Sequence, residues 1–64
     1  MEARQLMDEK AAAARLGATV SFMRRCRLFK TGPTYLKLGK LVRYSDADLD
    51  EYIEKGKVEP STIN

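Results

Sequence analysis

Histidine is absent from this sequence of 64 residues, and cysteine occurs only once, as Cys26. A single cysteine excludes an intrachain disulfide and suits a reducing compartment. One thiol without any imidazole also leaves no thiolate or imidazole zinc site. Because these residue types provide neither a nucleophile–base pair nor a metal set, we expect a chain that is not an enzyme and carries no metal or other cofactor.

Long apolar runs are also missing. No stretch is long enough to cross a bilayer, and the first residues lack the apolar core of a signal peptide. With 44% hydrophobic and 33% charged residues, the chain belongs to the soluble class. We therefore expect a cytoplasmic protein without a membrane partner. A chain this short buries only about 60% of its extended surface, so we expect one small domain.

Charge is unevenly distributed along the chain, although the net charge is only +3. Between positions 10 and 43 the sequence has nine basic residues and no acidic one, whereas positions 46 to 59 have six acids against two lysines. The middle of the chain therefore suits a polyanionic partner, and its end would be repelled by one.

Two short helices joined by a glycine-containing turn are predicted in the first half. Asp8 is a good N-cap for a helix over 9–16, which is rich in alanine, and Gly17 suits a left-handed helix end. Thr19 can cap a second helix that ends near Phe29. This order is the helix-turn-helix pattern. Before it, positions 6 and 7 either form a short strand or pack on the core.

The second helix has two contrasting faces. Its predicted apolar face consists of Phe22, Met23, Cys26 and Phe29. The basic side chains lie largely off that face, with two further residues at its exposed start; the full set is Val20, Ser21, Arg24, Arg25 and Arg27. These arginines could simply form a solvated face, but no acid lies near them in sequence, so we interpret them as DNA contacts. Ser21 could bond the backbone of the first turn or a phosphate.

A β-hairpin and a third helix are predicted to follow. The runs 35–38 and 41–44 are joined by Gly39 and Lys40, which is typical of a two-residue hairpin. We expect Lys37, Lys40 and Arg43 to cluster at the hairpin tip and on one of its faces, where they either neutralise phosphates or merely protect a sheet edge. Ser45 can cap a helix over 46–55 with an apolar stripe of Leu49, Tyr52 and Ile53.

The predicted fold class is thus α+β: a small winged helix, in which a hairpin wing follows the second helix of the helix-turn-helix. The winged domain should span residues 6–56, because Gly56 is a stop signal for the last helix. Residues 1–5 and 57–64 are predicted to be a flexible N-terminus and a flexible tail.

Three stretches resemble one known family. The sequence LMDEKAAAARLG at 6–17 is similar to the opening of the excisionase and AlpA-like helix-turn-helix domains, which are related to the MerR group. GPTYLKLGKLVRY at 32–44 resembles the wing of that family almost residue for residue, and SDADLDEYI at 45–53 resembles its closing helix. The segment CRLF at 26–29 also looks like part of a phage lambda-type excisionase. Ala11, where the family usually has Glu, and Cys26, where it has an aromatic residue or Leu, depart from the pattern.

The resemblance implies a small DNA-binding protein of a phage or mobile element, acting in a bacterial or phage-infected cell close to the nucleoid. Members either bend attachment-site DNA and direct an integrase toward excision, often as cooperative neighbours, or regulate transcription. By position, Ser21, Arg24 and Arg25 would face the major groove, and Lys37, Lys40 and Arg43 would belong to the wing. We expect an excisionase without a small-molecule substrate. The alternatives are an AlpA-like regulator and, in another class, a protein-interaction module that uses the acidic third helix.

Overall fold

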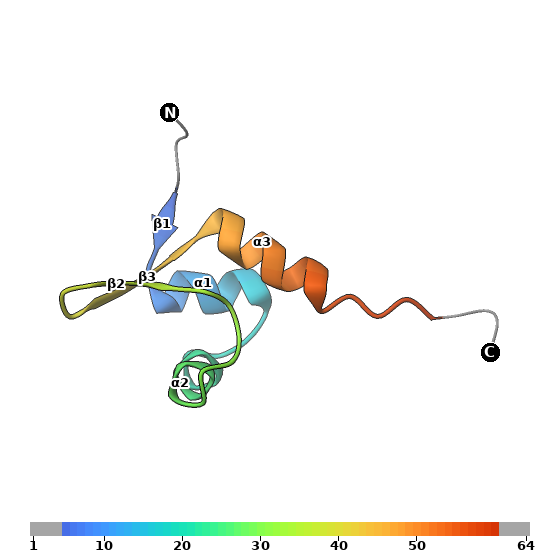
Figure 1. Cartoon of the computed structure of the whole chain (residues 1–64), viewed down its shortest axis with the longest axis horizontal. Helices are drawn as coiled ribbons and strands as arrows, with labels where there is room; N and C mark the ends of the chain where they lie inside the picture. The colour runs from blue at the N-terminus through green and yellow to red at the C-terminus, as the bar shows by residue number, and fades with distance from the viewer. Residues whose placement is uncertain (1–4, 61–64) are drawn as a thin grey trace.

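Three helices and three strands make up the computed structural model, which describes residues 5–60 (Figure 1). The elements are β1 (Leu6–Met7), α1 (Glu9–Leu16), α2 (Val20–Leu28), β2 (Leu36–Leu38), β3 (Leu41–Ser45) and α3 (Asp46–Lys55). The predicted order of helix, turn, helix, hairpin and helix is confirmed, and β1 decides for a strand at positions 6 and 7. The domain is α+β, with α1 lying between α2 and α3 (Figure 1).

The caps of α1 and α2 are those that the sequence indicates. The Asp8 carboxylate accepts a hydrogen bond from the Ala11 N–H, and the Thr19 hydroxyl accepts one from the Phe22 N–H. Between the two helices, Gly17 has a φ of 68°, the left-handed conformation that glycine adopts at little cost. The turn is therefore fixed by side-chain caps and by one glycine, and α2 begins at Val20.

The three strands form one antiparallel sheet in the order β1-β3-β2. Leu38 pairs with Leu41, which leaves a two-residue turn whose first residue, Gly39, has a φ of 65°. This confirms the predicted hairpin and its glycine-first turn. On the other side of β3, Met7 pairs with Tyr44, so the N-terminal strand joins the hairpin to one sheet.

The register corrects the prediction for the basic residues of the hairpin. Lys37 pairs with Val42, and Leu36 pairs with Arg43. Because residues directly opposite one another share a face of the sheet, Lys37 and Arg43 lie on opposite faces rather than on one. The face that carries Lys37 also carries Val42 and Tyr44, which pack on the core. The opposite face leaves Leu38 and Leu41 exposed.

A small core fills the space between the helices and the sheet. Its buried members come from all three helices and from β3, and they are Ala12, Ala13, Met23, Tyr44 and Leu49. The alanines of α1 allow this close packing because they add little volume. The apolar faces predicted for α2 and α3 each included a residue that does not pack in the core. Phe29 is 65% exposed and Ile53 is 40% exposed, so neither belongs to the core.

The start of α3 is tied to the sheet. The Ser45 hydroxyl accepts a hydrogen bond from the Asp48 N–H, and the Gln5 carbonyl accepts one from the Asp46 N–H. At the other end α3 stops at Gly56, as expected, although the backbone of this glycine has the right-handed helical conformation rather than the left-handed one. Residues 57–60 are exposed and irregular, while 1–4 and 61–64, predicted to be flexible, lie outside the described residues. Within 5–60 no helix is long and apolar enough to cross a membrane.

Candidate nucleic-acid interface

The exposed surface of α2 carries only part of the predicted contact set. Ser21 and Arg25 are exposed, and the Arg25 side chain forms no ion pair with any residue between 5 and 60. Val20, predicted at the exposed start of the helix, is instead half-buried and packs against the core cluster. Val20 is the first residue of α2, and its side chain packs against the core together with Phe22 and Met23 from the same end of the helix.

Glu9 of α1 pairs with two of the three α2 arginines. Arg24 binds the carboxylate through Nε and Nη2, with Nη2 2.7 Å from Oε2, and Arg27 Nη2 lies 3.1 Å from Oε1. The sequence argument favoured free arginines because no acid lies near them in the chain, and for Arg24 and Arg27 that inference was wrong. It considered only acids nearby in sequence, whereas α1 packs against α2 and brings in a carboxylate from 15 and 18 positions away.

Arg27 stabilises the fold at the edge of the core and is not one of the exposed arginines. Its side chain is 20% exposed, and its Nη1 donates a hydrogen bond of 2.9 Å to the Tyr44 hydroxyl. Its guanidinium also lies 5.8 Å from the centre of the Tyr35 ring, within the range of a cation–π contact. Arg27 therefore joins α1, α2 and the hairpin. Tyr35 and Tyr44 are themselves packed together, with 6.1 Å between their ring centres, as packing residues should be.

The ion pairs shift the pKa of the groups that form them. Hydrogen bonds from Arg24, and more weakly from Arg27, lower the pKa of the Glu9 carboxyl against a smaller opposing effect of desolvation. The same bond to Glu9 raises the pKa of Arg24. Glu9 is therefore a carboxylate at neutral pH. It places a negative charge beside the arginines of α2.

The hairpin presents its basic groups in two different ways. Lys37, in the middle of β2, and Lys40, in the turn, are exposed. Arg43 is half-buried and bends back, so that its Nη1 donates to the Val42 carbonyl at 2.8 Å. The face that carries Lys37 is the one turned toward α2, because Tyr44 of that face bonds Arg27.

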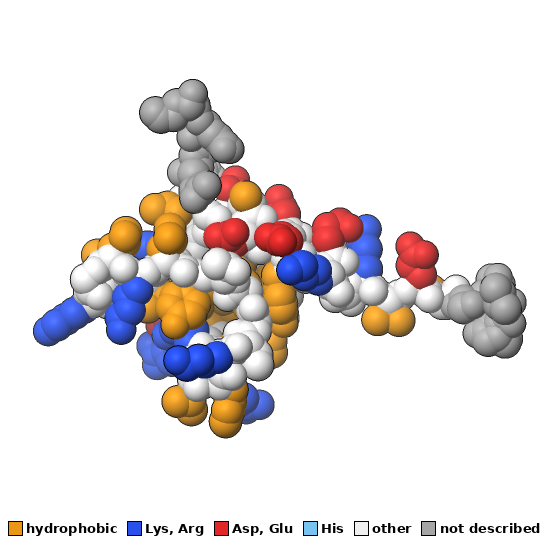
Figure 2. All heavy atoms as spheres, in the orientation of Figure 1, with side chains coloured by type: hydrophobic (Ala, Val, Ile, Leu, Met, Phe, Trp, Pro, Cys, Tyr) orange, Lys and Arg blue, Asp and Glu red, His pale blue; other side chains and the backbone are white. Residues whose placement is uncertain are grey.

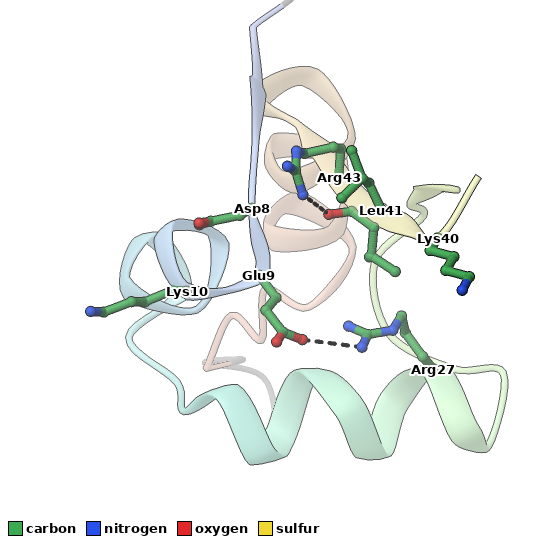
Figure 3. Close-up of a pocket in the computed structure, with 8 residues that line it drawn as sticks. Asp8, Glu9, Lys10, Arg27, Lys40, Leu41 and Arg43 are labelled. Atoms are coloured by element: carbon green, nitrogen blue, oxygen red, sulfur yellow. Dashed lines mark hydrogen bonds and ion pairs between the residues drawn. The ribbon is translucent and has the colours of Figure 1, made fainter. Parts of the chain in front are cut away.

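A shallow hollow of about 300 Å³ lies between the start of α1, α2 and the hairpin (Figure 3). Glu9 and Arg27 point toward one another across it, while Lys10 points away. Arg27 of α2 and Lys40 of the hairpin both border the hollow. Its lining residues are Asp8, Glu9, Lys10, Arg27, Lys40, Leu41, Val42 and Arg43.

Opposite charges occupy opposite parts of the molecule. In Figure 2 lysine and arginine side chains gather over the hairpin and α2, and the acidic side chains gather over α3, where some basic side chains lie among them. The α3 acids have local partners: Asp50 is paired with Arg15 of α1, and Glu51 and Glu54 with Lys55 and Lys57. The basic surface on α2 and the hairpin is thus less neutralised than the acidic one on α3, since among residues 5–60 only Glu9 forms ion pairs with it.

Lys30 is a basic residue of this surface that the predicted site omitted. It is exposed and has a φ of 56°, which is unusual for a residue other than glycine. Lys30 follows the end of α2. Its N–H donates a hydrogen bond to the Arg27 carbonyl, and the Thr31 N–H donates one to the Cys26 carbonyl. These two bonds define a Schellman motif, in which the left-handed position is usually glycine. Gly32 and Pro33, which follow, indicate a helix end in the sequence, but a lysine does not mark the left-handed position.

Cys26 is buried, as expected for a small apolar residue, and its free thiol lies under the loop after α2. Gly32 in this loop has a φ of 81° and comes so close that an added Cβ would lie 2.6 Å from the Cβ of Cys26. The space that an aromatic residue or leucine would fill at position 26 is therefore taken by the loop backbone. Within residues 5–60, no cluster of three potential metal ligands is present.

No model of a known protein family matches this chain, and no curated protein matches it significantly.

Proposed function

We propose that this chain is a winged-helix protein that binds double-stranded DNA, with α2 in the major groove and the hairpin alongside. The observation that carries the proposal is that lysine and arginine side chains gather over α2 and the hairpin (Figure 2). Among the basic residues of these segments, Arg25 of α2, Lys30 just after it, and Lys37 and Lys40 of the hairpin are exposed. An α-helix fits the major groove, and phosphate contacts by lysine and arginine fix its position there. The acidic α3 lies on the other side of the domain, where it would face away from the duplex (Figure 2).

The contact set of this proposal differs from the one predicted from the sequence. Ser21, Arg24 and Arg25 remain candidates for the groove, and Lys37 and Lys40 remain candidates for the phosphates of the flanking backbone. Lys30 joins them, whereas Arg27 and Val20 act mainly through packing. Arg43 stays a candidate only if its side chain turns out from the Val42 carbonyl.

The specific role that we propose is that of an excisionase. Several copies would bind adjacent sites in the cytoplasm of a bacterial or phage-infected cell, bend the attachment-site DNA and present it to an integrase, without catalysing a reaction. Bending 20–30 base pairs costs on the order of 1–6 kcal/mol, which multiple phosphate contacts can offset. What supports this role is the likeness of 6–17, 32–44 and 45–53 to the excisionase and AlpA-like domains.

Duplex binding tests the proposal directly. Titration of a labelled random-sequence duplex should show an affinity that falls steeply with salt, because phosphate contacts release counterions. Lys37→Ala should reduce the slope of log affinity against log salt by about 1, the value of one phosphate contact. Lys57→Ala is the matched control, since Lys57 is an exposed lysine paired with Glu54 at the end of α3. Absence of duplex binding at low salt, or affinity indifferent to salt, would reject DNA binding.

Two further experiments separate the alternatives. In a reconstituted excision reaction with a cognate integrase, an excisionase is required, whereas a transcription regulator leaves the reaction unchanged. An interaction module would instead depend on α3. Charge reversal at Asp50 and Glu54 would then abolish function, and Arg24→Ala with Arg25→Ala would not. Both acids already have basic partners within the domain, which favours DNA binding over this module.

A further inference from the structure

Glu9 is a carboxylate at the centre of a surface that we propose to be turned toward a polyanion. It lies in the first turn of α1 and borders the hollow between α2 and the hairpin (Figure 3). A helix dipole favours an acid at this position, but the dipole does not require its side chain to reach two arginines of another helix. In a complex with DNA, this negative charge would oppose binding.

The two partners of Glu9 are not equivalent. Arg27 is 20% exposed and is bonded to Tyr44 as well, so the Glu9–Arg27 pair belongs to the packed structure. The side chain of Arg24, by contrast, is 65% exposed. An ion pair to a side chain as exposed as Arg24 is screened by solvent, so this bond contributes less to folding than the enclosed Glu9–Arg27 pair does.

The geometry of the Arg24 pair leaves part of its guanidinium free. Glu9 accepts from Nε and Nη2, the side edge of the group. A guanidinium has five N–H donors in one plane, so the Nη1 edge and one Nη2 hydrogen stay available to another ligand. A guanine O6 and N7 pair takes two parallel N–H donors of this kind. An arginine held on one edge by a carboxylate presents the other edge in a fixed orientation.

We infer that Glu9 is a specificity-determining positioning residue, which orients Arg24 for a base contact and reduces affinity for non-target DNA. This inference rests on the proposed function, because it assigns a role within the same DNA-binding surface. Glu9 itself touches no base. It acts through Arg24, by restricting the arginine that would otherwise swing to the nearest phosphate and by adding one negative charge beside the duplex.

The test compares Glu9→Gln with Glu54→Gln, which removes the same charge from α3. Binding to a random-sequence duplex should strengthen by up to about ten-fold for Glu9→Gln at 0.1 M salt, the contribution of one phosphate contact. Glu54→Gln should change it less than two-fold. Selection from a random duplex pool should also give a motif that is degenerate at one base pair for Glu9→Gln, and the wild-type motif for Glu54→Gln. A Glu9→Gln protein that matches Glu54→Gln in both measurements would overturn the inference.

A second variant tests the same idea at Arg24 itself and keeps both members of the Glu9–Arg27 pair. Arg24→Lys keeps the charge but loses the planar fork, so it should lose preference at the same base pair while its affinity for random duplex changes less than about three-fold. In the Arg24→Lys background, Glu9→Gln should cause no further change in the selected motif. An unchanged motif in Arg24→Lys would reject the role of Arg24. Wild-type protein that fails to bind any duplex would reject the proposed function instead, which keeps the two failures distinct.

Discussion

Two arginines of α2, two positions apart, have different tasks in this molecule. Arg27 donates to Tyr44 and Glu9 from a half-enclosed site, whereas Arg25 is exposed and unpaired within residues 5–60. We expect Arg27→Ala to lower the free energy of unfolding by about 1–3 kcal/mol, because it leaves the hydroxyl of buried Tyr44 without this partner. Arg25→Ala should change it by less than about 0.5 kcal/mol while weakening duplex binding.

Urea denaturation followed by circular dichroism measures the first effect, and duplex titration of the folded variants measures the second. If Arg25→Ala lost more stability than Arg27→Ala, the assignment of structural and binding roles would be reversed. The same pair shows what the sequence could not give. Helical spacing put both arginines off the apolar face, but only the packing of α1 and the hairpin decided which one is enclosed.

At the scale of elements, the loop after α2 depends on Gly32 in two ways. Its φ of 81° disfavours any side chain, and an added Cβ would collide with Cys26. Gly17 has a similar φ of 68° but no atom within 4 Å of such a Cβ. We expect Gly17→Ala to cost about 1–2 kcal/mol through backbone strain alone, and Gly32→Ala to cost about 1–3 kcal/mol more, because the loop must also move off Cys26.

Thermal or urea unfolding of the two variants measures this difference, with Gly17→Ala as the matched control. Equal losses of stability would mean that the loop can move off Cys26 at no cost.

The helices and strands were the most predictable features of this chain, since Asp8, Thr19 and Ser45 are capping residues at the start of each helix and Gly39 selects the hairpin turn. The faces of the hairpin were less predictable. Alternation alone does not say which residues pair across the turn, and the register separated Lys37 from Arg43.

At the scale of the whole molecule, one carboxylate links the two helices of the basic half, and its titration should be visible in stability. The pKa of Glu9 is lowered in the folded state by Arg24 and Arg27. Its stabilising contribution is therefore complete above the ordinary glutamate pKa of about 4.3, and it is lost as the pH falls through the lower folded value. We expect Glu9→Gln to be less stable than wild type by about 1 kcal/mol at pH 7, and the two to converge toward pH 3.

Urea unfolding from pH 7 to pH 3 tests this expectation, with Glu54→Gln as the control on α3. A difference between wild type and Glu9→Gln that stayed constant over this range would contradict the ion-pair account. The overall division of charge was predictable, because nine basic residues and no acid lie between positions 10 and 43, before the acidic segment. The contact of an acid with this basic half was not predictable. Glu9 lies outside the basic run in the sequence and reaches Arg24 and Arg27 only in the folded chain.

The close approach of Gly32 to Cys26 gives this domain an internal reporter. Cys26 is the only thiol of the chain, and the loop backbone covers it. A thiol reagent can reach the sulfur only after that loop lifts, so its rate of labelling measures how often the cover opens. The same loop leads from α2 into the hairpin, and the labelling rate of a single natural atom therefore records how firmly the two halves of the basic surface are held in place.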